Sequence, residues 1–131
     1  MKFKHLFVFT VVFALVALAT SCSKPSESKI VGKWEAVSIQ ERSSVHPEWE
    51  SMGIKPNTYL EFRSDGTYSS YENGELDDSG IWSYNKDKNQ LVIDGMPFDI
   101  ISFSSTQMVL NVKSTFEDKW WETETTLKKM K

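Results

Sequence analysis

Residues 57–84, NTYLEFRSDGTYSSYENGELDDSGIWSY, decide the fold class of this chain. Apolar and polar residues alternate through much of the stretch, which is the period-two pattern of strands with one buried face. Ser64-Asp65-Gly66 and Asn73-Gly74 interrupt the alternation. Both are hairpin signals, because glycine accepts the positive φ angle that tight turns require. The stretch therefore predicts three consecutive antiparallel strands joined by two short turns.

The same succession of strands and turns continues on both sides of this stretch. Eight strands are predicted at spacings of about 8–14 residues, over residues 30–40, 57–63, 67–72, 76–84, 90–94, 98–103, 107–112 and 119–127. No helical period is sustained after residue 30, and the one long connection is the polar segment 41–56. Short links favour an up-and-down barrel over a sandwich, and closure removes both exposed sheet edges. We expect an all-β protein, an eight-stranded antiparallel up-and-down β-barrel preceded by a signal peptide.

The first 21 residues differ in composition from the rest of the chain. They hold 15 apolar residues, two lysines and no acidic residue. Two lysines before the apolar run 6–18 are typical of a secretory signal peptide. The run is too short for a membrane-spanning helix, which needs about 20 apolar residues.

Cys22 marks the end of this signal. Residues 18–22, LATSC, resemble the lipobox of bacterial lipoproteins, in which cleavage precedes a cysteine that carries lipid, although Ala19 stands where an apolar residue is usual. An ordinary cleavage site at residues 17–19 is the alternative and would give a secreted protein. As the chain's one cysteine, Cys22 has no intramolecular disulfide partner. We expect a signal peptide over 1–21, a flexible tether over 22–29 and a barrel over 30–131, anchored to a membrane of the bacterial cell envelope, most simply the outer membrane.

Two further motifs give a family resemblance. Gly32-Lys33-Trp34 in the first strand looks like the G-x-W signature of lipocalins. Residues 62–68, FRSDGTY, and 80–82, GIW, together with the short body, resemble the lipocalin-like domains of bacterial lipoproteins over residues 30–128. The resemblance implies that Gly32 and Trp34 close one end of the barrel. In the family an arginine near the last strand often covers that tryptophan, and here Lys128 or Lys129 stands at the corresponding place.

Charge and composition exclude several classes of function. Residues 22–131 carry 13 basic and 18 acidic residues with no basic stripe, so nucleic acid is not an expected partner. His46, Glu48 and Glu50 do not have a zinc spacing, and a solvated loop is the preferred interpretation. We interpret the acidic group Glu75, Asp77 and Asp78 as a solvated hairpin end, because neighbouring strand residues point to opposite faces and the pattern of a calcium loop is absent. No catalytic motif, metal site or cofactor is predicted, and we expect a protein that is not an enzyme.

Aromatic residues are the remaining candidates for a binding role. Those assigned to the inward face are Trp34, Phe62, Tyr68, Trp82, Tyr84, Phe98 and Trp121. An eight-stranded barrel is just wide enough to be filled by side chains or to hold one small ligand, and both alternatives stay open. If there is a pocket, we expect Tyr68, Trp82, Tyr84, Phe98 and Trp121 to line it, with the two tyrosines as polar handles.

Trp120 suggests a different function, because it points outward if Trp121 points inward. With Trp49 and Phe103 it would form an exposed apolar patch, although cover by a neighbouring strand or by segment 41–56 is the preferred interpretation. The leading hypothesis is therefore a membrane-anchored, non-enzymatic lipocalin-like protein that binds a small apolar or amphipathic ligand. The alternative is a protein-interaction or inhibitor module that acts through its outer surface.

Overall fold

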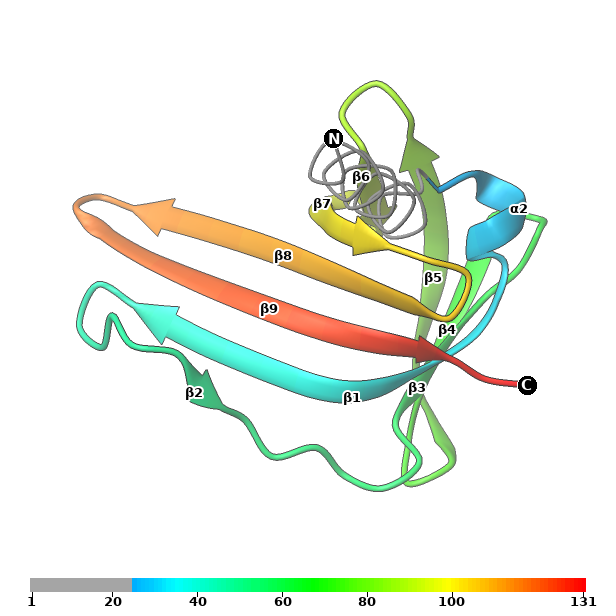
Figure 1. Cartoon of the computed structure of the whole chain (residues 1–131), viewed down its shortest axis with the longest axis horizontal. Coiled ribbons are helices and arrows are strands. Elements are labelled where there is room, and N and C mark those ends of the chain that lie inside the picture. Colours follow the sequence, from blue (N-terminus) through cyan, green and yellow to red (C-terminus); the bar gives the residue numbers. More distant parts are fainter. Residues whose placement is uncertain (1–24) are drawn as a thin grey trace, which may run out of the picture.

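The computed structural model describes residues 25–131, and these residues form one sheet of antiparallel strands that follows a short helix (Figure 1). In chain order the elements are α2 (Glu27–Ile30), β1 (Gly32–Ser43), β2 (Glu50–Ser51), β3 (Tyr59–Phe62), β4 (Thr67–Glu72), β5 (Glu75–Asn85), β6 (Gln90–Ile93), β7 (Met96–Phe103), β8 (Gln107–Phe116) and β9 (Lys119–Lys129).

The sheet closes on itself. From β3 to β9 each strand pairs with the next one along the chain, and β1 pairs with both β3 and β9. The β1–β9 ladder runs from Trp34 opposite Lys129 to Ser43 opposite Trp121. The result is a closed eight-stranded antiparallel barrel, with β2 lying against β1 outside the ring. The predicted all-β fold and its closure are confirmed.

Because all neighbours are antiparallel, the turns alternate between the two ends of the barrel. The start of β1, the end of β9 and the β3–β4, β5–β6 and β7–β8 turns share one end, beside α2 (Figure 1). We call this the sealed end. The β4–β5 and β6–β7 turns and the β8–β9 hairpin are at the opposite end, which we call the open end.

The predicted hairpin turns are present, and they use the residues that the sequence indicated. Gly66 has a φ of 87° between β3 and β4, and Asn73 and Gly74 have φ angles of 57° and 76° between β4 and β5. Asp94 and Gly95 make a third such turn, with φ angles of 50° and 82°. Left-handed conformations at both central residues match the twist of the flanking strands, which is why Asn-Gly and Asp-Gly favour hairpins.

The core fills the sealed end and the middle of the barrel. It contains four of the aromatic residues that were predicted to point inward, Trp34, Phe62, Tyr68 and Trp82. The remaining core residues are apolar side chains from the helix and from β6 to β9: Ile30, Leu91, Ile100, Phe103, Met108, Leu110 and Leu127. The aromatic rings pack edge-on or tilted, with 5.3 Å between the centroids of Phe62 and Trp82.

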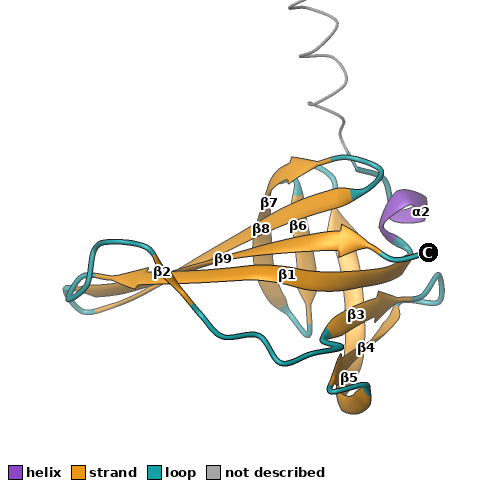
Figure 2. Ribbon diagram, turned by 60° about the horizontal axis from the view of Figure 1, so that its bottom comes forward, coloured by secondary structure: helices purple, strands orange, loops and turns teal. Residues whose placement is uncertain are grey.

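The strands β1, β8 and β9 project beyond the ring, and β1 and β8 continue further than predicted (Figures 1 and 2). Pairing of β7 with β8 stops at Asp99 opposite Asn111, whereas pairing of β8 with β9 continues to Phe116 opposite Lys119. β1 continues to Ser43, and β2 lies within the segment 41–56 that was expected to be a loop. We call residues 41–43, 112–116 and 119–123, with β2, the arm.

The N-terminal segment differs in part from the prediction. α2 and the buried residue Ile30 show that the expected tether, residues 22–29, overlaps an ordered helix. The predicted signal peptide and Cys22 lie outside the described residues. Within residues 25–131, no helix is long and apolar enough to cross a bilayer.

Candidate functional site

Trp34 is the centre of the sealed end. Its side chain has no exposed surface, and its indole N–H donates to the carbonyl oxygen of Ile30 at 2.8 Å. Ile30 is itself fully buried, so α2 acts as a plug that is fixed to the first strand. An indole N–H seldom lies buried without an acceptor, and this bond satisfies it.

Lys129 covers the same tryptophan from the last strand. Its Nζ lies 4.6 Å from the centroid of the Trp34 ring and donates to the carbonyl oxygens of Val31 (2.6 Å) and Lys29 (3.3 Å). Burial lowers the pKa of the Lys129 ammonium group. Of the two lysines that the resemblance indicated, Lys129 therefore occupies the place of the family's arginine.

Gly32 allows this arrangement. Its φ is 134°, and an added Cβ would lie only 2.6 Å from Nζ of Lys129. Glycine adopts such backbone angles without the steric cost that other residues meet. The close approach of Lys129 explains why residue 32 of this chain has no side chain.

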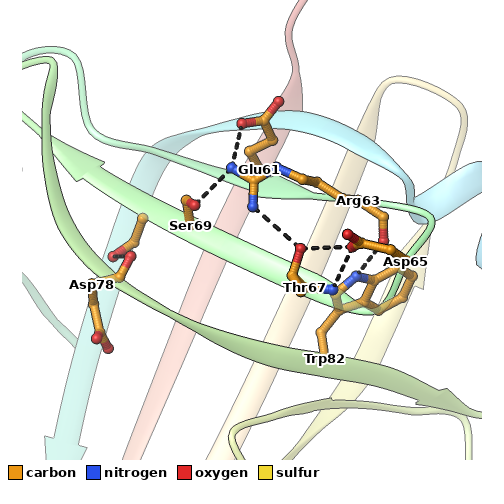
Figure 3. Close-up of polar contacts among 8 residues, drawn as sticks. Glu61, Arg63, Asp65, Thr67, Ser69, Asp78 and Trp82 are labelled. Atoms are coloured by element: carbon orange, nitrogen blue, oxygen red, sulfur yellow. Dashed lines mark hydrogen bonds and ion pairs between the residues drawn. The ribbon is translucent and has the colours of Figure 1, made fainter.

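Side-chain hydrogen bonds fix the motif FRSDGTY, which forms the β3–β4 turn (Figure 3). The Arg63 guanidinium donates to Oγ of Ser69 at 2.7 Å and to Oε1 of Glu61 at 3.0 Å. Oδ1 of Asp65 accepts bonds from the hydroxyl and backbone N–H of Thr67, and these bonds lower the pKa of Asp65. The indole N–H of Trp82 donates to the carbonyl oxygen of Arg63 at 2.8 Å, which ties the turn to β5. The motif is thus a structural device of the sealed end.

Tyr68 reaches the open end through its hydroxyl group. The hydroxyl donates to Oδ2 of Asp94 at 2.8 Å and lies 3.2 Å from Oδ2 of Asp78. Burial and the bonds to these carboxylates raise the pKa of the phenol. The Asp94 carboxylate lies over Gly80, where a Cβ would collide with it, and its Oδ1 accepts from the backbone N–H of Ile81.

The two expected polar handles are already engaged within the barrel. Tyr68 bonds to Asp94, and the Tyr84 hydroxyl donates to Oδ1 of Asn89 at 2.9 Å. Tyr84 and Phe98 are partly buried and pack against the core, whereas Tyr68 and Trp82 are part of it. A ligand role for these four residues stays a prediction, and a ligand would have to compete for the tyrosine hydroxyls.

Trp121 is the fifth residue that was expected to line a pocket. Leu110, in the core, lies opposite Thr125, which in turn lies opposite Ile39. Opposite residues share a face and alternate residues keep it, so Trp121 is on the inward face of β9. It is, however, two rows beyond Thr125 on the arm, and 44% of its surface is exposed. Trp121 therefore faces inward as predicted but lies on the arm beyond the ring, and its ligand role stays a prediction.

The outer face of the arm holds a stack of cations and indoles. The Arg42 guanidinium lies 4.2 Å from the Trp49 ring centroid and 5.9 Å from that of Trp120, and the Lys113 ammonium group lies 4.7 Å from Trp120. Arg42 also donates to Oε1 of Glu122 at 2.8 Å. Trp120 is thus partly covered by its neighbours. Phe103, in contrast, is buried in the core and does not join a surface patch with the two tryptophans.

Glu122 is the most tightly held carboxylate of this face. Its burial would raise its pKa, but bonds from Asn111 (2.8 Å) and Arg42 outweigh that effect, and the pKa is lowered overall. Two bonds to one carboxylate fix the relative positions of β1, β8 and β9.

The polar groups considered for metal binding are spread out. Within residues 25–131, no three His, Cys, Asp or Glu side chains come together in a way that could hold a metal ion. His46, Glu48 and Glu50 line a shallow hollow of about 260 Å³ with Pro47 and Trp49. Asp78 turns towards Tyr68, and Asp77 and Glu75 are exposed on the same strand.

The family model of the lipocalin-like domain matches residues 30–110. The chain belongs to the lipocalin-like domain family. The matched range holds the G-x-W strand, the FRSDGTY turn, β2 and the start of β8, and it ends before the parts of the arm that β8 and β9 form. The chain matches no curated protein and no solved structure. The family and its barrel are therefore established, and the arm residues of β8 and β9 lie outside the match.

Two residues of this lipocalin-like domain were not anticipated. Asp94 had been assigned to the end of a strand, although the dipeptide Asp94-Gly95 is itself a hairpin signal. The sequence indicates Gly80 only as part of the motif GIW, with no reason for its lack of a side chain. A glycine inside a strand often marks a close approach by another group, and here that group is the Asp94 carboxylate.

Proposed function

We propose that this lipocalin-like protein binds a small apolar or amphipathic molecule at the open end of its barrel and is not an enzyme. The family supports a small-ligand function in general terms. The choice of the open end depends on how unevenly the interior is filled.

The observation that carries the proposal is the difference in burial between the two ends. At the sealed end Ile30, Trp34 and Leu127 have no exposed surface. Towards the open end the inward-facing apolar side chains are only partly buried, among them Ile39 and Val112. Partly exposed apolar side chains on the inner face of a barrel are what an apolar ligand would cover.

The rim of the open end adds a preference for the ligand's polar group. The rim includes the carboxylates of Asp78 and Asp94, beside the Tyr68 hydroxyl, and the charged residues of β5 before Asp78 are also acidic. An anionic head group would be repelled there. The ligand we propose therefore carries a neutral or cationic head group on an apolar body.

In the same cluster, the Tyr68 hydroxyl has a structural role. The one phenol that meets two carboxylates has a raised pKa, so it stays protonated near neutral pH and is a poor base or nucleophile. Its hydroxyl serves to position Asp94.

Fluorescence of the buried tryptophans tests the ligand proposal. A matched series of dodecanoate, dodecanol and dodecyltrimethylammonium, kept below micellar concentrations, is titrated into detergent-free protein carrying Cys22→Ser. We expect the alcohol and the cation to change the emission and raise the melting temperature, and dodecanoate to bind more weakly. If none of the three changes either signal, the proposal is wrong.

A pair of neighbouring variants locates the site. Thr125 shares the inward face with Leu110. Thr126 is on the outward face, where it pairs with Val109 and Ser38. Thr125→Phe should weaken ligand binding about tenfold, which corresponds to about 1.4 kcal/mol, because it fills the open end. Thr126→Phe should leave binding unchanged. Equal effects of the two substitutions would contradict binding inside the barrel.

The anchor is a second part of the proposal. The apolar run 6–18 and the lipobox-like LATSC support lipid attachment to Cys22, and hence a place on a membrane of the bacterial cell envelope, with the outer membrane the simplest choice. Several acyl chains would suffice to hold the protein on the membrane surface, since each buried methylene contributes about 0.8 kcal/mol. Cys22→Ser should move the protein from the detergent phase to the aqueous phase in a phase separation. An unchanged distribution would contradict lipidation.

The outer face of the arm favours a second candidate function, a protein-interaction or inhibitor module. Trp49 and Trp120 are joined through Arg42, and Trp and Arg are the residues most enriched at binding hot spots. If this face binds a protein, Trp120→Ala or Trp49→Ala should abolish capture of one discrete partner, whereas Thr125→Phe should not. Capture that is unaffected by both tryptophan substitutions would exclude this candidate.

A further inference from the structure

Charge is distributed very unevenly along the axis of the barrel. The segments at the sealed end are residues 25–35, 61–67, 84–90, 103–107 and 127–131. Together they carry eight basic and five acidic residues, a net charge of +3. The remaining described residues carry four basic and thirteen acidic residues, a net charge of −9. The molecule is therefore strongly dipolar, with its positive side at the sealed end.

The basic side chains of the sealed end are available to a partner. They come from α2, from the start of β1, from the β5–β6 turn and from the C-terminus, and the exposed ones are Lys29, Lys33, Lys86, Lys88, Lys128 and Lys131. Lys129 is not in this set, because its ammonium group is turned inward onto Val31. We call these six residues the basic rim.

The N-terminal part of the chain reaches the barrel at this same end. α2 lies across the sealed end and is followed directly by β1 (Figures 1 and 2). Only two residues separate Cys22 from Pro25, the first described residue. Three backbone steps span at most about 11 Å, which is between one and two Debye lengths at physiological salt, where that length is about 8 Å. A lipid on Cys22 would thus hold the basic rim within electrostatic reach of the lipid head groups.

We propose that the basic rim docks the sealed end onto an anionic phospholipid surface, so that the open end faces away from the bilayer. This inference rests on the proposed lipid anchor at Cys22. The anchor supplies attachment, and the six lysines together with the acidic open end supply orientation. Anionic lipid attracts the positive end and repels the negative one. Ligands then enter and leave from the aqueous side, and the arm points into the compartment.

Two single-cysteine labels test the orientation on the lipidated full-length product, in which Cys22 is blocked by its lipid. A bimane fluorophore is placed at Asp87→Cys in the β5–β6 turn or at Glu75→Cys at the start of β5, which are exposed positions at opposite ends. The vesicles contain phosphatidylcholine and phosphatidylglycerol in a ratio of 7:3 (roughly one negative charge per three lipids), with a nitroxide on a fraction of the head groups. We expect most of the fluorescence to be lost at position 87 and no loss at position 75.

A matched pair of charge reversals shows whether the lysines cause the orientation. Lys128→Glu with Lys131→Glu removes part of the basic rim, and Lys55→Glu with Lys119→Glu makes the same change of net charge elsewhere. The first double variant should abolish the difference in quenching between the two labels. The second double variant should leave that difference unchanged. Vesicles of phosphatidylcholine alone should also reduce the difference.

The outcomes separate this inference from the anchor itself. Protein that does not float with the vesicles would contradict the lipid anchor, and the orientation with it. Protein that floats but shows equal quenching at both positions, or stronger quenching at position 75, would overturn the orientation and leave the anchor intact. Quenching at position 87 that both charge reversals leave unchanged would show that the tether alone sets the orientation, which contradicts a role for the basic rim.

Discussion

The sealed end and the arm are built from the same strands, β1 and β9, and yet they differ in almost every physical respect. At the sealed end the two strands enclose Trp34 and Leu127, which have no exposed surface. On the arm the same ladder ends at Ser43 and Trp121, and 44% of the Trp121 surface is exposed. The contrast shows that the alternation along a strand determines on which face a residue lies. Whether that face is buried depends on whether the other strands of the barrel surround it.

The largest expected effect comes from removing one tryptophan at each end. Trp34→Ala should lower the free energy of unfolding by about 3–5 kcal/mol, because it leaves a cavity and removes the bond to Ile30. Trp121→Ala should lower it by less than about 1 kcal/mol, since that side chain is exposed. Urea denaturation of both variants measures the difference. Similar losses would break the comparison between the two regions.

A pair of glycines tests the backbone of the sealed end. Gly32→Ala should cost about 1–3 kcal/mol of unfolding free energy, because its φ of 134° strains other residues and its Cβ would meet Lys129. Gly53→Ala is the control, as nothing lies within 4 Å of an added Cβ and its φ is not in the positive region. The control should change stability by less than about 0.5 kcal/mol. A neutral Gly32→Ala would mean that Lys129 is not fixed over Trp34.

Tyr68 sharpens the comparison at the boundary between core and open end. Tyr68→Phe should cost about 1 kcal/mol, through loss of the bond to Asp94. The raised pKa of the phenol means that the folded state keeps its proton longer than the unfolded state does. The corresponding stability is present below the ordinary tyrosine pKa and is lost as the pH rises above it.

The alkaline unfolding curve of Tyr68→Phe should therefore be flatter than that of the unchanged protein above about pH 10. Tyr84→Phe, which removes a hydroxyl bonded to a neutral amide, is the matched control. Identical alkaline curves for Tyr68→Phe and the unchanged protein would contradict the arrangement around Asp94.

The smallest effect is expected on the arm. Glu122→Gln should cost about 0.5–1 kcal/mol at neutral pH, because it weakens the bonds from Arg42 and Asn111. The pKa of Glu122 is lowered in the folded state, so its contribution is present above the ordinary glutamate pKa and is lost as the pH falls through the folded value. Acid titration of stability should show less pH dependence in the Gln variant below about pH 4.5. Equal pH dependence would indicate that the arm's outer face is not ordered by this carboxylate.

Much of the barrel could be predicted from local signals. The strand over residues 67–72 coincides with β4, because Gly66 and Asn73-Gly74 bound it on both sides. The family resemblance also predicted that Lys128 or Lys129 covers Trp34, and in the structure the residue is Lys129. These features depend on turn chemistry and alternation, which are properties of short stretches.

The rest depends on contacts between distant residues. Alternation assigned Trp121 to the correct face. Its exposure depends on how far β8 and β9 extend beyond the end of β7, and the sequence of β9 alone does not determine that length. Nor could the sequence show that Asp94 would reach across to Gly80, since that contact requires the register between β5 and β6. The ends of strands and the depth of a residue in the barrel therefore had to come from the structure.

Hydrogen–deuterium exchange with and without dodecanol tests the central claim most directly, namely that one end of the barrel is sealed and the other accepts a ligand. Without ligand, the amides of β1 next to Trp34 should exchange only by global unfolding, and those of the arm should exchange by local opening. With ligand, added protection should appear at the open end, around residues 36–39, 93–98 and 123–125, and should be small at the sealed end. Protection confined to the sealed end, or no change at either end, would contradict the account.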